Sequence, residues 1–181
     1  MQAFESLVAA LLEREGYWVR QSFKVELAKD EKRQIGRPSS PKWELDVVAY
    51  RPGDRQLLAV ECKSYFDSRG VTYEEVANGN KDDTRYKLFV DAKLRDVVLR
   101  RLALQLTERK SIAPDSVVRL CLATGRIATA ADRAKLKAQF DANNWLLLDE
   151  AWAREGLRLL AKGGYENSVA AVVAKLLAIP G

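Results

Sequence analysis

The sequence of 181 residues contains no histidine, and this absence removes many common catalytic arrangements. Ser-His-Asp and Cys-His nucleophile systems need an imidazole as the general base. His-ligated zinc sites and the histidine-metal nucleases need an imidazole as a ligand. Any general acid–base chemistry in this chain therefore falls to carboxylates, lysine, tyrosine or a metal-bound water.

Cysteine is scarce, and long apolar runs are missing. Cys62 and Cys121 each lie inside an apolar, strand-like run, so we expect buried, reduced thiols. No apolar run approaches the length of a membrane span. The N-terminus opens with an acidic helix pattern rather than a basic segment followed by an apolar one. These absences predict a cytoplasmic protein without a membrane partner.

The residues that are present suit an ordinary globular protein. Hydrophobic residues make up 48% of the chain and charged residues 30%. We expect one domain over residues 1–181, with a core over about 1–161 and a C-terminal helix over 165–178. The net charge of +5 and the pI of about 9.2 give mild support for a polyanionic partner.

The most informative stretch runs from Trp43 to Tyr65 and predicts two strands joined by a turn. Residues 51–54, Arg-Pro-Gly-Asp, predict a type II turn in which Gly53 takes the positive φ. The flanking runs, 45–50 and 56–60, are rich in β-forming residues. Together they predict an antiparallel hairpin.

Symmetric pairing about this turn sets Val47 opposite Val60, and the charged residues follow outward. The next predicted pairs are Asp46 with Glu61 and Glu44 with Lys63. A tighter loop would set Glu44 opposite Glu61 instead. Because residues two apart share a face, one face is expected to hold Glu44, Asp46, Glu61, Lys63 and Tyr65. The other face is expected to hold Leu45, Val47, Ala49, Leu58, Val60 and Cys62.

Two carboxylates facing each other across a ladder lie roughly 5 Å apart and repel each other. This arrangement is tolerated on a solvated edge, or where a cation sits between the two groups. Apolar residues extend the same face, which indicates partial burial and favours a cation. An edge hairpin with surface charges remains the alternative.

The rest of the chain predicts a mixed α/β fold, with later strands added to the hairpin through helical crossovers. Gly16 is expected to end the first helix. The last helix has a broad apolar face that could complete the core or form a dimer surface. The expected helices are 2–15, a short one at 73–78, 86–110, 130–142, 150–161 and the C-terminal helix; the further strands are 17–19, 23–27, 117–123 and 145–148; the polar loops are 28–42 and 66–85.

Basic residues gather in the first polar loop and on the long helix. The candidates for phosphate contacts are Lys29, Lys32, Arg33, Arg37, Lys42, Arg100 and Arg101. Cations beside an acidic hairpin are well placed to hold a nucleic-acid backbone. Ordinary solvated side chains are the alternative.

Asp46 followed by Glu61-Cys62-Lys63 resembles the signature of the PD-(D/E)XK nuclease superfamily. The surrounding pattern is similar to Mrr-like restriction endonuclease domains. The similar segments are 4–8 with Leu11, Leu12, Gly16 and Tyr17, then 123–126, the following helix and 146–149. The resemblance covers most of the chain outside residues 28–42 and 66–85. It implies a restriction-endonuclease-like fold, with a mixed central sheet and flanking helices.

The resemblance also implies roles for these residues. Asp46 and Glu61 would bind Mg²⁺, or Mn²⁺ as a substitute, together with the backbone carbonyl of Cys62. Lys63 would position the attacking water or stabilise the transition state. Glu5 matches a helix glutamate that some members add to the metal site. Glu44, as a partner of Lys63, and Tyr65 are auxiliary candidates.

The sequence therefore predicts a Mg²⁺-dependent nuclease, an enzyme that hydrolyses phosphodiester bonds, with DNA favoured over RNA. A catalytically silent module of the same fold that binds nucleic acid or protein is one alternative. A small interaction domain that forms a homodimer through its terminal helix is another.

Overall fold

A mixed five-stranded sheet lies at the centre of the described part of the chain, in the order β1-β2-β3-β4-β5. The computed structural model describes residues 2–36, 42–79, 85–164 and 168–179. The strands are β1 (Trp18–Val25), β2 (Trp43–Arg51), β3 (Gln56–Lys63), β4 (Val117–Thr124) and β5 (Leu146–Leu148). The pairs β1–β2 and β2–β3 are antiparallel, whereas β3–β4 and β4–β5 are parallel. The expected α/β class, with a hairpin extended through helical crossovers, is confirmed at this level.

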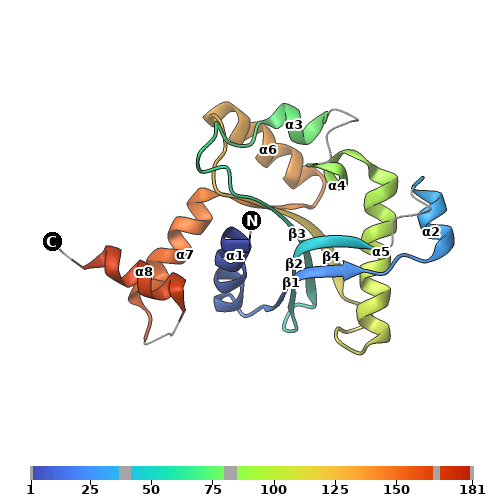
Figure 1. The fold of residues 1–181 in the computed structure, drawn as a ribbon, viewed down its shortest axis with the longest axis horizontal. Coiled ribbons are helices and arrows are strands. Elements are labelled where there is room, and N and C mark those ends of the chain that lie inside the picture. Colours follow the sequence, from blue (N-terminus) through green and yellow to red (C-terminus); the bar gives the residue numbers. More distant parts are fainter. Residues whose placement is uncertain (1, 37–41, 80–84, 165–167, 180–181) are drawn as a thin grey trace.

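Helices cover both faces of the sheet (Figure 1). On one face lie α1 (Gln2–Arg14) and α7 (Glu150–Lys162); on the other lie α3 (Tyr73–Ala77), α4 (Lys87–Val90), α5 (Ala92–Glu108) and α6 (Ala130–Ala142). The short helix α2 (Lys29–Gln34) lies beside α5, and α8 (Val169–Ala178) lies outside α7. No described helix is both long and apolar enough to cross a bilayer.

Local signals explain where most helices begin and end. Gly16, at φ +86°, follows α1 in the left-handed conformation that glycine adopts easily. The side chains of Asp91, Thr129 and Asp149 accept backbone N–H groups at the starts of α5, α6 and α7. Asp91 divides the single helix expected over 86–110 into α4 and α5. That expectation was wrong because the cap lay inside an otherwise helical run.

The hairpin has the expected register but not the expected turn. Val47 pairs with Val60, and the pairing continues to Arg51 and Gln56. The positive φ falls on Arg55 (+54°) rather than on Gly53, so the type II turn was wrong. The Arg55 N–H donates to the Pro52 carbonyl at 3.3 Å, which closes the turn one residue later than expected.

In β1 and β2, alternate side chains change from one face of the sheet to the other at one position. At this position Ser22 of β1 lies opposite Asp46 of β2. Ser22 has φ +49°, and the β1–β2 pairing skips this position before it resumes at Phe23 and Leu45. Val47 packs against α1, whereas Leu45 packs in the core on the α5 side. The prediction that Leu45 shares a face with Val47 was therefore wrong, because the β1–β2 pairing is interrupted at Ser22 and Asp46.

Two polar segments also differ from expectation. Residues 29–34, expected in a loop, form α2, a six-residue helix with no buried side chain and therefore no apolar periodicity to detect. The C-terminal helix begins at Val169 with Ser168 as its cap, and residues 165–167 lie outside the described residues.

Candidate functional site

The predicted acidic residues lie where β2 and β3 separate. The ladder between these strands ends at Val47 and Val60, so the expected pairs Asp46–Glu61 and Glu44–Lys63 lie beyond it. Oδ2 of Asp46 instead accepts the backbone N–H of Cys62 at 2.7 Å. The carboxylate thus takes the place of a backbone carbonyl and holds the two diverging strands together.

The backbone of Cys62 faces the same space as Asp46. In a strand the N–H and C=O of one residue point to the same side. Because the Cys62 N–H reaches Asp46, the Cys62 carbonyl is also directed toward β2, past the end of their ladder. On the opposite side, the Lys63 carbonyl accepts the Gly125 N–H at 3.0 Å and joins β3 to β4.

Glu61 and Lys63, on either side of Cys62 in β3, form an ion pair. Oε2 of Glu61 and Nζ of Lys63 are 3.6 Å apart, and the two side chains are only 15% and 11% exposed. Burial raises the pKa of Glu61 to about 7, with Asp46 adding to the rise and Lys63 opposing it. The Glu61 carboxyl is therefore poised between its neutral and charged forms near neutral pH.

Lys63 also rests near an aromatic ring. Its Nζ lies 5.9 Å from the centre of the Tyr86 ring, within the range of a cation–π contact. Tyr86 is 2% exposed, and burial and the neighbouring Tyr65 phenol raise its pKa. The lysine ammonium is thus held between the Glu61 carboxylate and a neutral aromatic surface.

The first helix brings one more carboxyl to the site. Burial raises the pKa of Glu5, and the charges of Asp46 and Glu44 raise it further, while Lys63 lowers it. Next to Glu5, Phe4 contacts Phe66 edge to face at 5.5 Å. Phe66 follows the end of β3, so this contact fixes the start of α1 against the strand that carries Glu61 and Lys63.

The oxygen atoms at this position are of the type that binds a magnesium ion. They are the Asp46 and Glu61 carboxylates and the Cys62 carbonyl, and Mg²⁺ prefers such hard ligands. Over the described ranges, no three His, Cys, Asp or Glu side chains group together to hold a metal. The side chains that could hold the ion are thus the two carboxylates of Asp46 and Glu61. Two carboxylates are usual for Mg²⁺ sites in which waters or substrate oxygens are the other ligands.

Two other predicted residues have different surroundings from those expected. Glu44 is exposed and pairs with Lys24 of β1, whereas Lys63 pairs with Glu61, so the predicted Glu44–Lys63 pair was wrong. The β2–β3 pairing ends before Asp46, so Glu44 of β2 is paired with β1 alone. Tyr65 is half-buried at φ +46°, just past β3, and its hydroxyl accepts from Arg85 at 3.5 Å.

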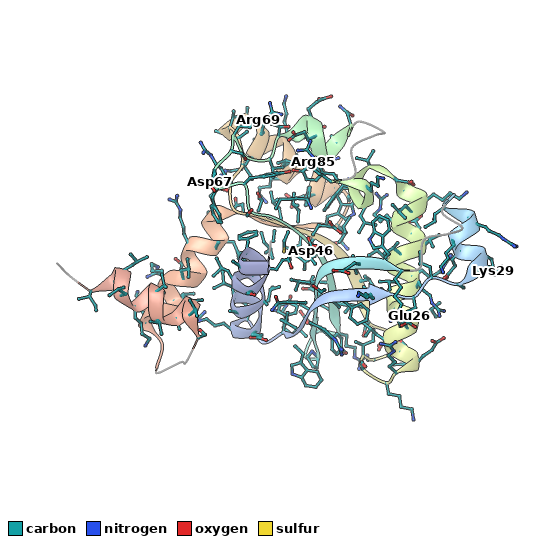
Figure 2. The ribbon with its side chains drawn as sticks, in the orientation of Figure 1. Glu26, Lys29, Asp46, Asp67, Arg69 and Arg85 are labelled. Atoms are coloured by element: carbon teal, nitrogen blue, oxygen red, sulfur yellow. The ribbon has the colours of Figure 1, made fainter. Side chains whose placement is uncertain are left out.

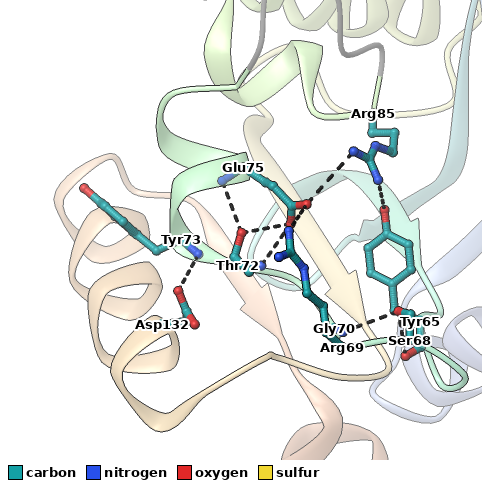
Figure 3. A network of polar contacts seen from close by, with 9 residues as sticks. All are labelled: Tyr65, Ser68, Arg69, Gly70, Thr72, Tyr73, Glu75, Arg85 and Asp132. Atoms are coloured by element: carbon teal, nitrogen blue, oxygen red, sulfur yellow. Dashed lines mark hydrogen bonds and ion pairs between the residues drawn. The ribbon is translucent and has the colours of Figure 1, made fainter.

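A polar network orders the loop that follows β3 (Figure 3). Glu75, in α3, accepts the Thr72 hydroxyl at 2.9 Å and backbone N–H at 3.2 Å. Arg69 donates to the same carboxylate at 3.0 Å, and Arg85 lies 4.0 Å from it. The Arg69 and Arg85 side chains are 72% and 52% exposed. One carboxylate therefore holds two solvent-facing guanidinium groups above the end of the sheet.

The cations predicted from sequence lie elsewhere. Figure 2 shows Lys29 on the α2 side of the molecule, whereas Arg69 and Arg85 lie above Asp46, on the side of α3. Arg101 donates to the Glu26 carbonyl at 2.9 Å and lies 3.9 Å from Glu31, so it ties α5 to neighbouring segments. The remaining candidates are Lys32, Arg33 and Arg100 on α2 and α5, Lys42 in an ion pair with Glu26 at 3.3 Å, and Arg37, which lies outside the described residues.

Comparisons with known proteins give one distant structural likeness. No protein-family model matches the chain, and no curated protein matches it. A crystal structure of a protein of unknown function, AF1548, is similar at 15% sequence identity and a TM-score of 0.42. The likeness covers 84% of this chain and 60% of that one.

The sequence predicted a site formed by Asp46, Glu61, Lys63 and Glu5, but it did not indicate the residues contributed by the loop after β3 and by the start of α4. The sequence predicted Tyr86 as the start of a helix, Glu75 in a short helix over 73–78 and Arg69 in a polar loop. The Thr72-x-x-Glu75 spacing is a capping-box signal that agrees with the start of α3 at Tyr73. Nothing in the sequence indicated that Tyr86 would lie beside Lys63.

Proposed function

We propose that this protein is a Mg²⁺-dependent nuclease that hydrolyses phosphodiester bonds, with DNA as its favoured substrate. One observation carries the proposal. At the end of the β2–β3 ladder, Asp46 accepts the Cys62 N–H, and the Glu61–Lys63 pair on β3 lies near enough for the Asp46 charge to raise the pKa of Glu61. We also propose that the chain has a restriction-endonuclease-like fold and is a member of the PD-(D/E)XK superfamily.

The pKa of Glu61 supports a cation at this point. Without a cation, burial and the Asp46 charge hold the Glu61 carboxyl partly protonated near neutral pH. A divalent ion between the two carboxylates would remove their repulsion and favour the charged form. When bound, Mg²⁺ would supply Lewis-acid activation of a water and neutralise charge on the scissile phosphate.

The protein's own groups would prepare the reaction. Asp46 and Glu61 would hold the ion at the end of the β2–β3 ladder, and Glu61 would give up its proton as the ion binds. Lys63, held by Glu61 and the Tyr86 ring, would place a positive charge against the phosphate as negative charge develops there. Arg69 and Arg85 would contact neighbouring phosphates from the loop above.

Cleavage of supercoiled plasmid and of labelled oligonucleotides, with Mg²⁺ or EDTA, tests the proposal. Asp46→Asn keeps an oxygen acceptor for the Cys62 N–H, and Lys63→Met keeps the aliphatic stem, so both should fold. We expect each to lower the cleavage rate at least about 100-fold. Lys29→Ala, on the α2 side, is the matched control and should cleave like the wild type.

Direct metal binding gives a readout that does not depend on finding the right substrate. Titration calorimetry should detect Mg²⁺ or Mn²⁺ binding that strengthens as pH rises through about 7, where Glu61 ionises. Asp46→Asn should abolish it. Nucleic-acid binding that needs no metal, without cleavage of any DNA or RNA, would instead favour the catalytically silent module.

A further inference from the structure

The C-terminal helix α8 presents its large apolar residues to solvent. Its small residues Ala171 and Ala174 are buried, and Ala174 packs in a cluster that includes Leu11 and Leu160. Its large residues recur at three- and four-residue spacing on the opposite side, in the pattern of a face that is normally buried. The exposed residues are Val169 (81%), Val172 (56%), Val173 (45%), Leu176 (66%), Leu177 (80%) and Ile179 (66%) just beyond the helix.

We propose that this face is covered by the same face of a second copy of the chain, in a twofold-symmetric dimer. The proposal does not rest on the nuclease assignment. The sequence left open whether this face completes the core or forms a dimer surface, and these residues are exposed among the described residues of one chain. Figure 1 shows α8 at the outside of the molecule, on the far side of α1 and α7 from the sheet.

The extent of the apolar surface fits a second copy. The six side chains expose on the order of 600 Å² together, at the upper end of what monomeric proteins leave in one patch. A standard interface buries about 800 Å² on each partner. The walls of the grooves beside the helix would supply the difference, so a dimer through this face would reach the size of a specific complex.

The shape of the surface is complementary to itself. A groove of about 500 Å³ lies between α1 and α8 and is lined by small residues such as Ala3, Ser6 and Ala10. A second groove, of about 380 Å³, lies between α7 and α8 beside Leu157 and Ala161. The helix is therefore a ridge between two grooves. A twofold axis would place the ridge of each copy in a groove of the other.

The charges also permit this contact. Lys175 is the one charged residue of α8, and its Nζ donates to the carbonyls of Gly163 and Gly164 at 2.7 Å each. This turns the ammonium away from the exposed stripe and keeps it satisfied. The helix α8 itself thus brings no unpaired charge to the contact, which would otherwise oppose association. The charged residues at the groove beside α7 are Arg154, Lys162 and Arg158, and Arg158 pairs with Glu155 at 2.6 Å.

Sedimentation of the full chain over a range of concentrations tests the proposal. We expect the wild type to form a dimer, and Leu176→Glu to weaken its dissociation constant by at least about 100-fold, because the change occurs twice in each dimer. Leu104→Glu, at a 46% exposed leucine on α5, is the matched control and should still dimerise. Circular dichroism should show both variants folded.

A crosslink tests the same contact at one position. Cys62 and Cys121 are both buried, so Leu176→Cys provides a single accessible thiol. We expect its oxidation to give a covalent dimer, and the same change at Leu104 not to do so. A wild type that stays monomeric at the highest concentration would overturn the proposal, as would open-ended oligomers. Binding of a monomer to phosphatidylcholine–phosphatidylserine vesicles through Leu176 would assign the face to a membrane instead.

Discussion

At the scale of single residues, the charge of Glu61 near neutral pH depends on its burial. Burial raises its pKa from an ordinary 4.5 to about 7. Between these values the unfolded chain has released the proton while the folded chain still holds it. The unfolded state therefore binds fewer protons, and the free energy of unfolding falls as pH rises through this window.

Glu61→Gln should remove this loss, because a neutral amide does not titrate. We expect the variant to gain stability relative to the wild type by up to about 3 kcal/mol between pH 4.5 and pH 8, at about 1.4 kcal/mol per pKa unit. Urea unfolding at several pH values without divalent metal measures the difference. Glu108→Gln, an exposed change on α5, is the control. A constant difference between Glu61→Gln and the wild type at all pH values would contradict the burial of Glu61.

Tyr86 is expected to act as a positioning residue for Lys63. Tyr86→Phe keeps the ring 5.9 Å from the Lys63 Nζ and should cleave DNA within about twofold of the wild type. Tyr86→Leu removes the ring and should lower kcat about tenfold. Cation–π contacts are worth about 0.5–2 kcal/mol, with the larger values at sites shielded from water. The pH profile of kcat should also move in Tyr86→Leu, because the charge of Lys63 lowers the pKa of Glu61 and the Tyr86 ring helps to hold that charge in place.

A merely structural role for Tyr86 would give a different result. Tyr86→Leu would then lower the melting temperature but leave kcat and its pH profile unchanged below that temperature. The leucine variant must therefore be assayed at a temperature where circular dichroism shows it folded.

At the scale of elements, the site depends on how tightly the ends of β3 and β4 approach. Gly125 directly follows β4, and its N–H donates to the Lys63 carbonyl. A Cβ at this position would lie 2.2 Å from the Ser64 carbonyl oxygen and 2.6 Å from the Phe66 ring. No side chain fits there without separating the strand that carries Lys63 from its neighbour.

Gly125→Ala should therefore destabilise the fold by roughly 2–4 kcal/mol, the range for overpacking against backbone. Gly53→Ala is the matched control, because a Cβ there meets nothing within 4 Å and the φ of Gly53 is not positive. Thermal unfolding compares the two. Equal melting temperatures for both variants would show that the β3–β4 junction can yield more easily than its contacts indicate.

The strands and the long loop after β3 show which features of the fold and site could be predicted from the sequence. The hairpin register was predictable because a turn signal and two β-rich runs constrain each other. The change of faces at Ser22 and Asp46 could not be predicted. The alternation of side chains assumes a regular strand, and a serine does not indicate a positive φ. The position of Tyr86 beside Lys63 depends on how the long loop after β3 returns to the sheet, which no local pattern specifies.

At the scale of the whole molecule, the distribution of charge matters more than the net value of +5. The sequence drew attention to α2 and α5, where lysines and arginines are dense. The fold uses Arg101 to join segments and pairs Lys42 with Glu26. At the end of the sheet near Asp46, Arg69 and Arg85 instead face solvent around one carboxylate (Figures 2 and 3).

The salt dependence of DNA binding distinguishes these two surfaces. Each phosphate contact contributes about 0.9 to the slope of log affinity against log salt concentration. If DNA approaches the Asp46 end of the sheet, Arg69→Ala should reduce that slope by about one, and Lys29→Ala should leave it unchanged. Fluorescence anisotropy with a duplex oligonucleotide, measured in EDTA to prevent cleavage, gives both slopes. The reverse result would mean that the backbone of the nucleic acid follows α2 and α5, and that the loop after β3 serves the fold rather than the substrate.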